Sequence, residues 1–311
     1  MDYRDILFFL ILFLIFLGFF LNLFIVITNF AWYLKGEALQ SVDIIMTCLS
    51  SIRIILLIRY LLGYLVNSPL TTIVVDLDTY RYLNLALMFL VFCSLWWGTA
   101  LGVFYCVKIT TYRNHLFMRL KMNISTTVPW ILTGSMVISF ISSLPCLWGT
   151  HPTNFTSIDS GNISNNEYSH SDHISYIQKQ QLNLLIITFA GSILPLLLFC
   201  VSIYLLIVSV LKHTRNMNSN NSGFAKPQLE AHKKALITMV SFLLLYFLYF
   251  LSSNLLFLSF YTRNPIFRSL CSIGVYSYPS LHSLMLIISN AKLKRSILSA
   301  FQSDVFSNRI S

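Results

Sequence analysis

Seven apolar stretches, each long enough to cross a lipid bilayer as a helix, divide this sequence into segments joined by polar connections. A transmembrane helix needs about 20 residues to span the hydrocarbon core. Hydrophobic residues make up 56% of the chain and charged residues 10%, outside the balance of a soluble domain. The sequence therefore predicts one all-α membrane domain over residues 1–311, a bundle of seven transmembrane helices. The predicted helices span residues 6–28, 42–65, 83–109, 128–148, 182–211, 236–260 and 270–290.

The distribution of lysine and arginine predicts the orientation of the chain, because short cytoplasmic segments carry an excess of basic residues. With an extracellular N-terminus, the cytoplasmic segments hold 14 of the 21 basic residues. The extracellular segments then hold five basic residues against seven acidic ones. Seven crossings place the C-terminus in the cytoplasm. The net charge of +10 thus indicates topology and attraction to membrane lipid, and we expect no nucleic-acid partner.

The connections between the predicted helices carry further topological signals. Residues 149–181, between the fourth and fifth helices, contain glycosylation sequons at Asn154 and Asn162. Only a lumenal asparagine can be modified, so both sequons fit an extracellular loop. The cytoplasmic tail, residues 291–311, has the pattern of a short amphipathic helix on the inner membrane face. Prolines that permit kinks fall within the predicted fourth, fifth and seventh helices: Pro145, Pro195 and Pro279.

The sequence lacks the residue patterns of an enzyme, a metal site or a cofactor site. It contains no Gly-rich phosphate loop, no H-E-x-x-H motif and no paired intramembrane carboxylates. None of its six cysteines form a C-x-x-C pair, and its seven histidines are scattered. A transporter usually carries acidic residues within the membrane, whereas the deep ionisable residues here are Arg53, Arg59 and His282. We therefore expect no enzymatic activity, cofactor or metal, and the pattern favours a receptor over a transporter.

Short motifs follow one another in a fixed order along nearly the whole chain. Residues 18–29 read G-x-x-x-N-x-F-I-x-x-x-N, and residues 104–109 read F-Y-x-x-K-I. Residues 278–294 read Y-P-S-x-H-S-x-x-L-I-x-x-N-x-K-L-K. Each motif is weakly specific, but their combined order and spacing resemble the type 2 taste receptors, the bitter receptors. The resemblance implies a G-protein-coupled chemosensory receptor in the plasma membrane, with small bitter molecules as agonists.

The resemblance also implies a ligand pocket in the outer half of the bundle. Trp96 lies eight residues before Phe104, a little over two helical turns, so both side chains can face the bundle. Aromatic side chains bind flat apolar or cationic molecules, but the same rings also serve for packing or as membrane-interface anchors. Because no acidic residue falls in this pocket, we expect neutral or weakly basic agonists. The implied ligand-binding residues are Trp96, Trp97, Ala100, Tyr64, Tyr249, Ser272 and Tyr276.

A lone arginine within a transmembrane helix must find hydrogen-bond acceptors inside the protein. The family alignment gives Asn22, Ser283 and backbone carbonyls of the seventh helix as candidate acceptors for Arg53. The predicted polar core consists of Asn22, Arg53, His282 and Ser283. The sequence leaves open whether this core is a static clamp between helices or a switch that rearranges on activation. The resemblance assigns no role to Arg59, which lies near the outer third of the second helix and can snorkel toward the interface.

At the cytoplasmic end, the resemblance implies a gustducin- or transducin-like heterotrimeric G protein of the inhibitory class, followed by phospholipase and calcium signalling. Basic residues at this end are also expected for topology alone. The implied G-protein-facing residues are Tyr105, Lys108, Lys212, His213, His232, Lys233 and Lys292. The open alternatives are a vomeronasal type 1 pheromone receptor and, in another class, a small-molecule membrane transporter. The sequence leaves the oligomeric state open, whether monomer, homo-oligomer or hetero-oligomer.

Overall fold

The computed structural model describes residues 3–66, 77–110, 115–148, 166–219, 226–262 and 264–307, and within these ranges the regular structure is helical. Seven of the described helices are long and apolar enough to span a membrane, which confirms the predicted all-α seven-helix bundle. The helices are α1 (Tyr3–Leu34), α2 (Ser41–Val66), α3 (Leu77–Ile109), α4 (His115–Ser143), α5 (Pro145–Trp148), α6 (Asn166–Ser219), α7 (Lys226–Thr262), α8 (Pro265–Ser289) and α9 (Ala291–Ser307).

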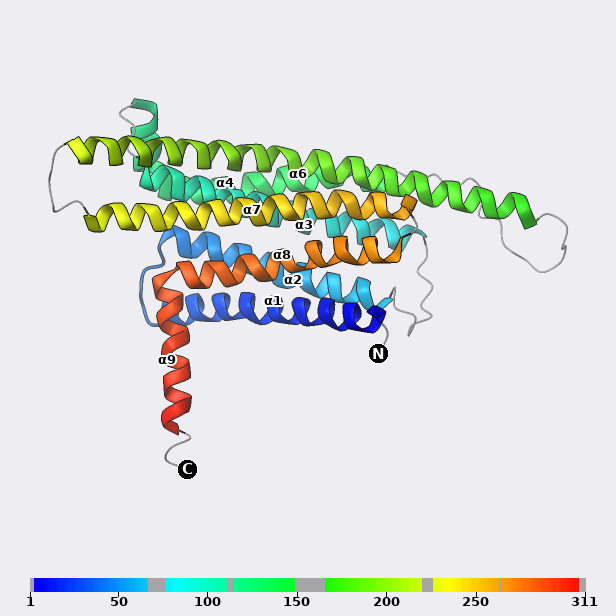
Figure 1. Ribbon diagram of the computed structural model, residues 1–311, viewed down its shortest axis with the longest axis horizontal. Helices are drawn as coiled ribbons and strands as arrows, with labels where there is room; N and C mark the ends of the chain where they lie inside the picture. Colours follow the sequence, from blue (N-terminus) through cyan, green and yellow to red (C-terminus); the bar gives the residue numbers. More distant parts are fainter. Residues whose placement is uncertain are drawn as a thin grey trace.

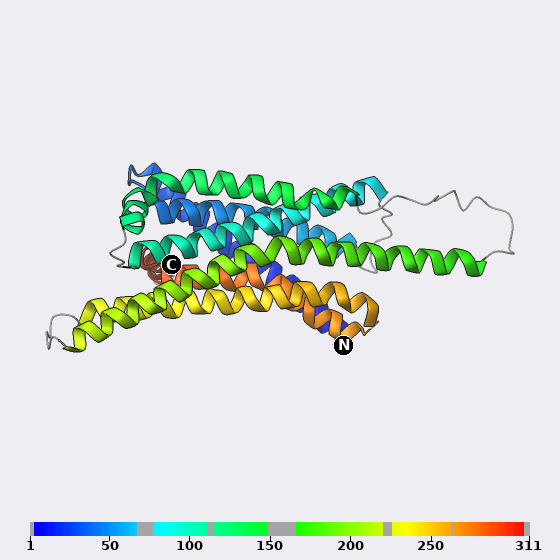
Figure 2. The same ribbon diagram turned by 90° about the horizontal axis from the view of Figure 1, so that it is seen from above.

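The long helices form a closed bundle in which α3 has the most central place. The helix α1 packs against α2 and α8, while α7 packs against α6 and α8. The helix α3 contacts α2, α4 and α6, so it joins the two sides of the bundle. Figure 1 shows α9 leaving the bundle at the end opposite the N-terminus, and Figure 2 shows the same helices from above. We call these two ends the amino-terminal end and the α9 end.

Five of the predicted apolar stretches lie whole within an observed helix (α1, α2, α3, α6 or α7) that extends beyond them, because the polar ends of a helix need not lie in the hydrocarbon core. The stretch 270–290 runs one residue past the end of α8 at Ser289. The largest difference is in α6, which begins at Asn166 and runs for 54 residues. The segment 149–181, predicted as a loop, is therefore helical from Asn166 onward. The two predicted glycosylation sites, Asn154 and Asn162, lie outside the described residues.

The fourth predicted helix differs from the expectation at Pro145. The helix α4 ends at Ser143, and Pro145 is the first residue of the short helix α5 rather than an interior residue. Proline fits this position because the first helical residue needs no hydrogen bond from its own nitrogen. A different proline, Pro129, lies inside α4, while Pro195 and Pro279 lie inside α6 and α8 as predicted.

Two asparagines set the boundaries of α8 and α9. The Asn264 side chain accepts hydrogen bonds from the backbone N–H groups of Ile266 and Phe267, capping the start of α8. Asn290 ends α8, and its Oδ1 accepts hydrogen bonds from the backbone N–H groups of Lys292 and Leu293 at 2.9 and 3.3 Å. An asparagine N-cap satisfies helix-start donors that otherwise lack a partner. Asn290 therefore starts a new helix, α9, at an angle to α8 (Figure 1).

Glycines allow the central helices to approach closely. A Cβ atom on Gly102 of α3 would overlap the Phe199 ring of α6, and one on Gly191 of α6 would overlap the Phe92 ring of α3. Small residues at helix contacts let backbones approach each other in a membrane, where packing drives association. Each of these two helices therefore packs a phenylalanine ring against a glycine of the other, which lets α3 and α6 lie close together.

Candidate functional site

Arg53 lies at the centre of a buried polar network and is itself fully buried. Its Nε donates to the Ser94 hydroxyl of α3 at 3.1 Å, and its Nη1 pairs with Nδ1 of His282 in α8 at 2.9 Å. Nη1 also donates to the Ser283 hydroxyl at 3.5 Å. Because a guanidinium only donates, Nδ1 of His282 accepts, and the proton of the neutral imidazole is on Nε2. The arginine therefore defines the tautomer of the histidine.

The network continues from α8 into α1. The Ser283 hydroxyl donates to Oδ1 of Asn22 at 2.8 Å, and Nδ2 of Asn22 donates to the Gly18 carbonyl at 2.8 Å. The structure thus brings together the four polar-core residues that the sequence grouped, across α1, α2 and α8. Ser94 adds α3 and was missed, because a single serine in an apolar helix carries no spacing signal. The network connects four of the long helices.

Aromatic rings surround the network on the α7 side. The Phe242 ring of α7 stacks on the His282 imidazole, with ring centroids 4.3 Å apart and planes 18° apart. The guanidinium carbon of Arg53 lies 5.2 Å from the centroid of the Tyr278 ring, within the range of a cation–π contact. Nη2 of Arg53 is buried without a hydrogen-bond partner. The guanidinium is therefore held by three side chains and one ring, with one nitrogen unsatisfied.

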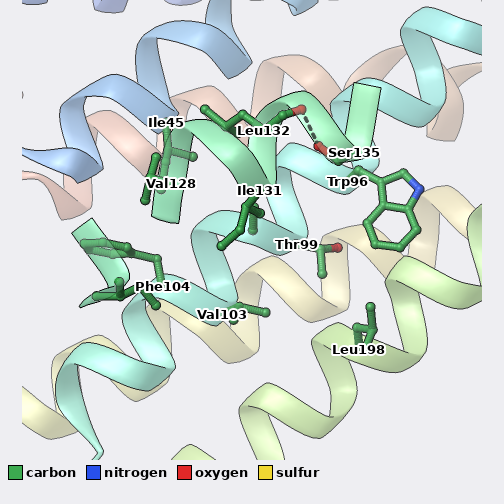
Figure 3. Close-up of a pocket in the computed structure, with 12 residues that line it drawn as sticks. Ile45, Trp96, Thr99, Val103, Phe104, Val128, Ile131, Leu132, Ser135 and Leu198 are labelled. Carbon is green, nitrogen blue, oxygen red and sulfur yellow. Dashed lines mark hydrogen bonds between the residues drawn. The ribbon is translucent and has the colours of Figure 1, made fainter. Parts of the chain in front are cut away.

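A crevice between α3, α4 and α6 contains two of the predicted ligand-binding residues, Trp96 and Ala100. Figure 3 shows Trp96 at one end of the cavity and Phe104 at the other. The cavity volume is about 130 Å³. The lining residues are Ile45, Trp96, Thr99, Ala100, Val103, Phe104, Ile124, Val128, Ile131, Leu132, Ser135 and Leu198.

The crevice presents an almost entirely apolar surface. Its two hydroxyl side chains are already paired with backbone carbonyls: Thr99 donates to Pro195 at 3.2 Å, and Ser135 donates to Leu132 at 2.8 Å. Ile131 and Leu198 are exposed on the outside of the bundle. Because a membrane-embedded bundle is surrounded by lipid, the crevice faces the bilayer between α4 and α6. It can hold a small apolar group.

The predicted tyrosines lie elsewhere, and none of them lines the crevice. Tyr276 of α8 makes edge contacts with Tyr60 and Tyr64 of α2, with ring centroids 4.9 and 5.9 Å apart. The Tyr60 hydroxyl interacts with that of Tyr249 in α7. These rings fill the amino-terminal half of the bundle by packing on one another. The crevice therefore extends from the middle of α3 toward the α9 end, not into the half where the sequence placed the pocket.

Two further predicted ligand residues have structural partners. Trp97 is buried, and its Nε1 donates to the Leu132 carbonyl of α4 at 3.2 Å. The Ser272 hydroxyl donates to the Arg268 carbonyl one turn earlier in α8, at 2.9 Å. Trp97 thus joins α3 to α4, and the hydroxyl of Ser272 is used within its own helix.

The predicted G-protein-facing residues are only partly described. Lys108 and Lys212 are exposed at the α9 end, and Tyr105 is half-buried there. The side chains of the remaining three residues of α6 and α7 lie outside the described part of the chain: His213, His232 and Lys233.

Lys292 has partners within the protein. Its Nζ lies 3.3 Å from Oδ2 of Asp43 in α2 and 3.7 Å from the centroid of the Trp32 ring in α1. The Asp43 side chain is nearly buried, with a relative exposure of 6%. This arrangement attaches the start of α9 to α1 and α2, which differs from the open, partner-facing position expected from the sequence.

Seven helices long and apolar enough to span a membrane, with a polar network across four of them, define a multi-pass membrane protein. Comparison with known proteins identifies its family. The family model described as taste receptor protein (TAS2R) matches residues 2–304. The chain belongs to this family, the type 2 taste receptors, which detect bitter taste. It is thus a plasma-membrane receptor and not an enzyme, and the pheromone-receptor and transporter alternatives are set aside.

Individual relatives match over most of their length. Taste receptor type 2 member 1 of Chlorocebus aethiops is 34% identical over 284 residues, which are 90% of each chain. Taste receptor type 2 member 39 of Homo sapiens is 30% identical over 282 residues, 90% of this chain and 81% of the relative. Taste receptor type 2 member 4 of Gorilla gorilla gorilla is 31% identical over 286 residues, 90% of this chain and 91% of the relative.

Proposed function

We propose that this taste receptor binds small bitter agonists in the crevice between α3, α4 and α6. The observation that carries the proposal is the position of Phe104. Its ring lines the crevice and also lies 5.7 Å, centroid to Nζ, from Lys108 at the α9 end of α3. An agonist in the crevice would therefore contact a residue that touches the proposed G-protein face.

The size of the crevice indicates that agonist binding widens it. A cavity of about 150 Å³ holds one benzene ring, and the crevice measures about 130 Å³. Larger agonists would have to separate Ile131 of α4 from Leu198 of α6. Movement of α6 away from α4 is then the expected first step of activation. Agonist affinities near 1 μM correspond to about −8 kcal/mol.

The test is calcium release in cells that express the receptor with a promiscuous chimeric G protein, screened against a panel of bitter compounds. Trp96→Ala should lower agonist potency by about tenfold, since an aromatic contact contributes about 0.5–1.5 kcal/mol beyond the burial of its surface and about 1.4 kcal/mol corresponds to a tenfold change. The matched control is Trp130→Ala, because Trp130 of α4 is 80% exposed. Equal losses in both variants, or no loss in either at equal surface expression, would contradict the crevice as the agonist site.

We further propose that the α9 end is cytoplasmic and activates a gustducin- or transducin-like G protein of the inhibitory class. Lys108 and Lys212 are exposed at this end and carry the positive charge expected on the cytoplasmic side. Lys108→Glu should reduce G-protein activation while agonist binding is retained. The control is Lys179→Glu, an exposed lysine of α6 toward the amino-terminal end. If both variants activate as the wild type does, Lys108 does not contact the G protein.

A further inference from the structure

The crevice between α3, α4 and α6 has two exposed lining residues, and both lie on the outside of the bundle. Ile131 of α4 is 40% exposed and Leu198 of α6 is 42% exposed. The other lining residues are buried or half-buried. Because Ile131 and Leu198 lie within membrane-spanning helices, the surface that they expose meets lipid. We call the opening beside these two side chains the mouth of the crevice.

Aromatic contacts close the amino-terminal side of the crevice along both neighbours of α3. The Phe92 ring of α3 lies against Gly191 of α6, where a Cβ atom would overlap the ring. The Phe89 ring of α3 makes an edge contact with the Phe140 ring of α4, with ring centroids 6.1 Å apart. Both contacts are closer to the amino-terminal end than Trp96, which lies at one end of the crevice (Figure 3). A molecule coming from the water at that end would have to separate these rings.

The side of the crevice toward the α9 end is also closed. Ile45 of α2, Phe104 of α3 and Ile124 of α4 line this side, and none of the three is more than 5% exposed. The mouth is therefore the open side of the crevice, and it leads into the bilayer.

The crevice has no polar group to spare for a ligand. Neither a carboxylate nor a basic group is among its lining side chains. The hydroxyl protons of Thr99 and Ser135 are donated to backbone carbonyls, and no lining residue has a buried nitrogen or oxygen that lacks a partner. Figure 3 shows the indole nitrogen of Trp96 on the side of the ring away from the other labelled residues. An ion that entered would lose its water without finding a counter-charge, which is costly.

We propose that the crevice takes its ligands from the bilayer through the mouth, and that it selects small, uncharged, apolar molecules such as alkylbenzenes. Its volume of about 130 Å³ suits one ring, since a cavity of about 150 Å³ holds benzene. This class is narrower than the neutral or weakly basic agonists expected from the sequence, because it excludes protonated bases. Activation by such ligands rests on the proposed agonist function of the crevice, whereas their binding and entry do not.

Binding is measured by photolabelling of the purified wild-type receptor in lipid nanodiscs. The probe is 3-trifluoromethyl-3-phenyldiazirine, which is uncharged and has one ring, and mass spectrometry locates the labelled residues. Labelling of Leu132 inside the crevice should saturate and should be displaced by toluene. Benzoate and benzylammonium should need at least about tenfold higher concentrations, because each would be a buried ion without a partner.

Ile141 of α4 is the internal control, since it is 59% exposed and does not line the crevice. Its labelling should rise with probe concentration without saturating, as expected for ordinary contact with lipid. If Leu132 is labelled in the same unsaturable way, lipid chains occupy the crevice and the proposal is overturned. Equal competition by toluene and the two ions would overturn the selection of uncharged ligands.

Two matched variants test the route of entry. Ile131→Ala widens the mouth, whereas Phe140→Ala removes one of the rings that close the amino-terminal side. Ile131→Ala should speed the protection of Leu132 by toluene at least about fivefold in rapid-mixing experiments, and Phe140→Ala should leave the rate unchanged. A faster rate in Phe140→Ala, or an unchanged rate in Ile131→Ala, would refute entry through the mouth.

A substitution that fills the mouth provides a second readout. Leu198→Trp should reduce the saturable labelling of Leu132, and its matched control is Ile141→Trp, at the exposed position outside the crevice. Thermal unfolding shows whether each variant is folded. An equal loss of labelling in the two variants would contradict the role of the mouth.

Calcium release separates this inference from the proposed function. If toluene binds in the crevice as expected but no compound evokes calcium release that depends on Trp96, the ligand class and the route hold and the proposed agonist function fails. If bitter agonists signal and lose potency in Trp96→Ala, while toluene does not protect Leu132, the ligand class fails and the proposed agonist function holds.

Discussion

Replacing Ser94 with alanine tests whether the Arg53 network holds the bundle together. The substitution removes the acceptor that lies 3.1 Å from Nε of Arg53 and creates a second unsatisfied nitrogen beside Nη2. A hydrogen bond to a charged group contributes about 1.5–3 kcal/mol, and hydrogen bonds within membrane bundles contribute up to about 1.7 kcal/mol. We therefore expect a loss of about 1.5 kcal/mol. At about 2–4 °C per kcal/mol, the expected fall in Tm is about 3–6 °C.

Thermal unfolding of the purified receptor measures this loss, with a thiol-reactive dye that reports exposure of the buried cysteines Cys93 and Cys106. The control is Ser202→Ala, since Ser202 is also buried and donates to the Leu198 carbonyl of its own helix at 2.8 Å. This control should lower the Tm by no more than about 1 °C, because the acceptor already belongs to a helical hydrogen bond.

A double-mutant cycle tests whether the loss of stability in Ser94→Ala comes from the hydrogen bond between Ser94 and Arg53. In an Arg53→Met background, Ser94→Ala should cost almost nothing, since the donor that needs the hydroxyl is absent. An equal Tm fall in both backgrounds would refute the role of Ser94 as an acceptor for Arg53. A fall in the wild-type background no larger than that of Ser202→Ala would refute it as well.

Signalling distinguishes the two interpretations of the network. If Arg53 is a static clamp, Ser94→Ala lowers Tm but leaves basal activity and agonist potency unchanged at matched surface expression. If the network is a switch, basal activity or potency changes at matched expression. Normal expression together with normal signalling in Arg53→Ala would contradict both interpretations.

Three further predictions follow from individual contacts. Gly102→Ala should destabilise the bundle by about 1–3 kcal/mol through overlap with Phe199, and Phe199→Leu should restore part of the loss. The control Gly134→Ala, at a position with no neighbour within 4 Å, should instead raise the Tm slightly through helix propensity. Lys292→Met should lower Tm by leaving the nearly buried Asp43 carboxylate unpaired, and limited proteolysis should then cleave the chain near α9 more readily than in the wild type. Replacing the asparagines of both sequons in residues 149–165 by glutamine should abolish a glycosidase-sensitive mobility shift on gels; a shift that persists would place glycosylation elsewhere.

Several site residues were predicted from sequence because family motifs carry them in fixed order. Asn22, Arg53, His282 and Ser283 belong to such motifs, and the structure brings them into one network. The roles of these residues in signalling remain predictions. Ser94 could not be found in this way, because its importance comes from facing Arg53 across a helix contact.

The predicted ligand-binding residues include some whose location could not be inferred from the sequence. Trp96 and Ala100 line the crevice, but Tyr64, Tyr249 and Tyr276 pack in a separate cluster. An alignment shows which residues occupy equivalent positions along their helices. Side chains at a similar depth in the membrane can still point into different spaces between the helices. Whether two predicted ligand residues line the same cavity depends on how each helix is rotated about its axis and on which aromatic rings fill the core.

The sequence alone determined that the chain forms seven membrane-spanning helices and belongs to the type 2 taste receptors. Both properties follow from local information, since apolar length defines a membrane helix and ordered motifs define a family. Only the tertiary structure decided that Arg53 meets Ser94, that Lys292 pairs with Asp43, and that Arg59 donates to the Leu83 carbonyl of α3. These contacts join residues on different helices, so they depend on how ridges and grooves of neighbouring helices interlock. That packing is a property of the whole bundle, which no single stretch of sequence contains.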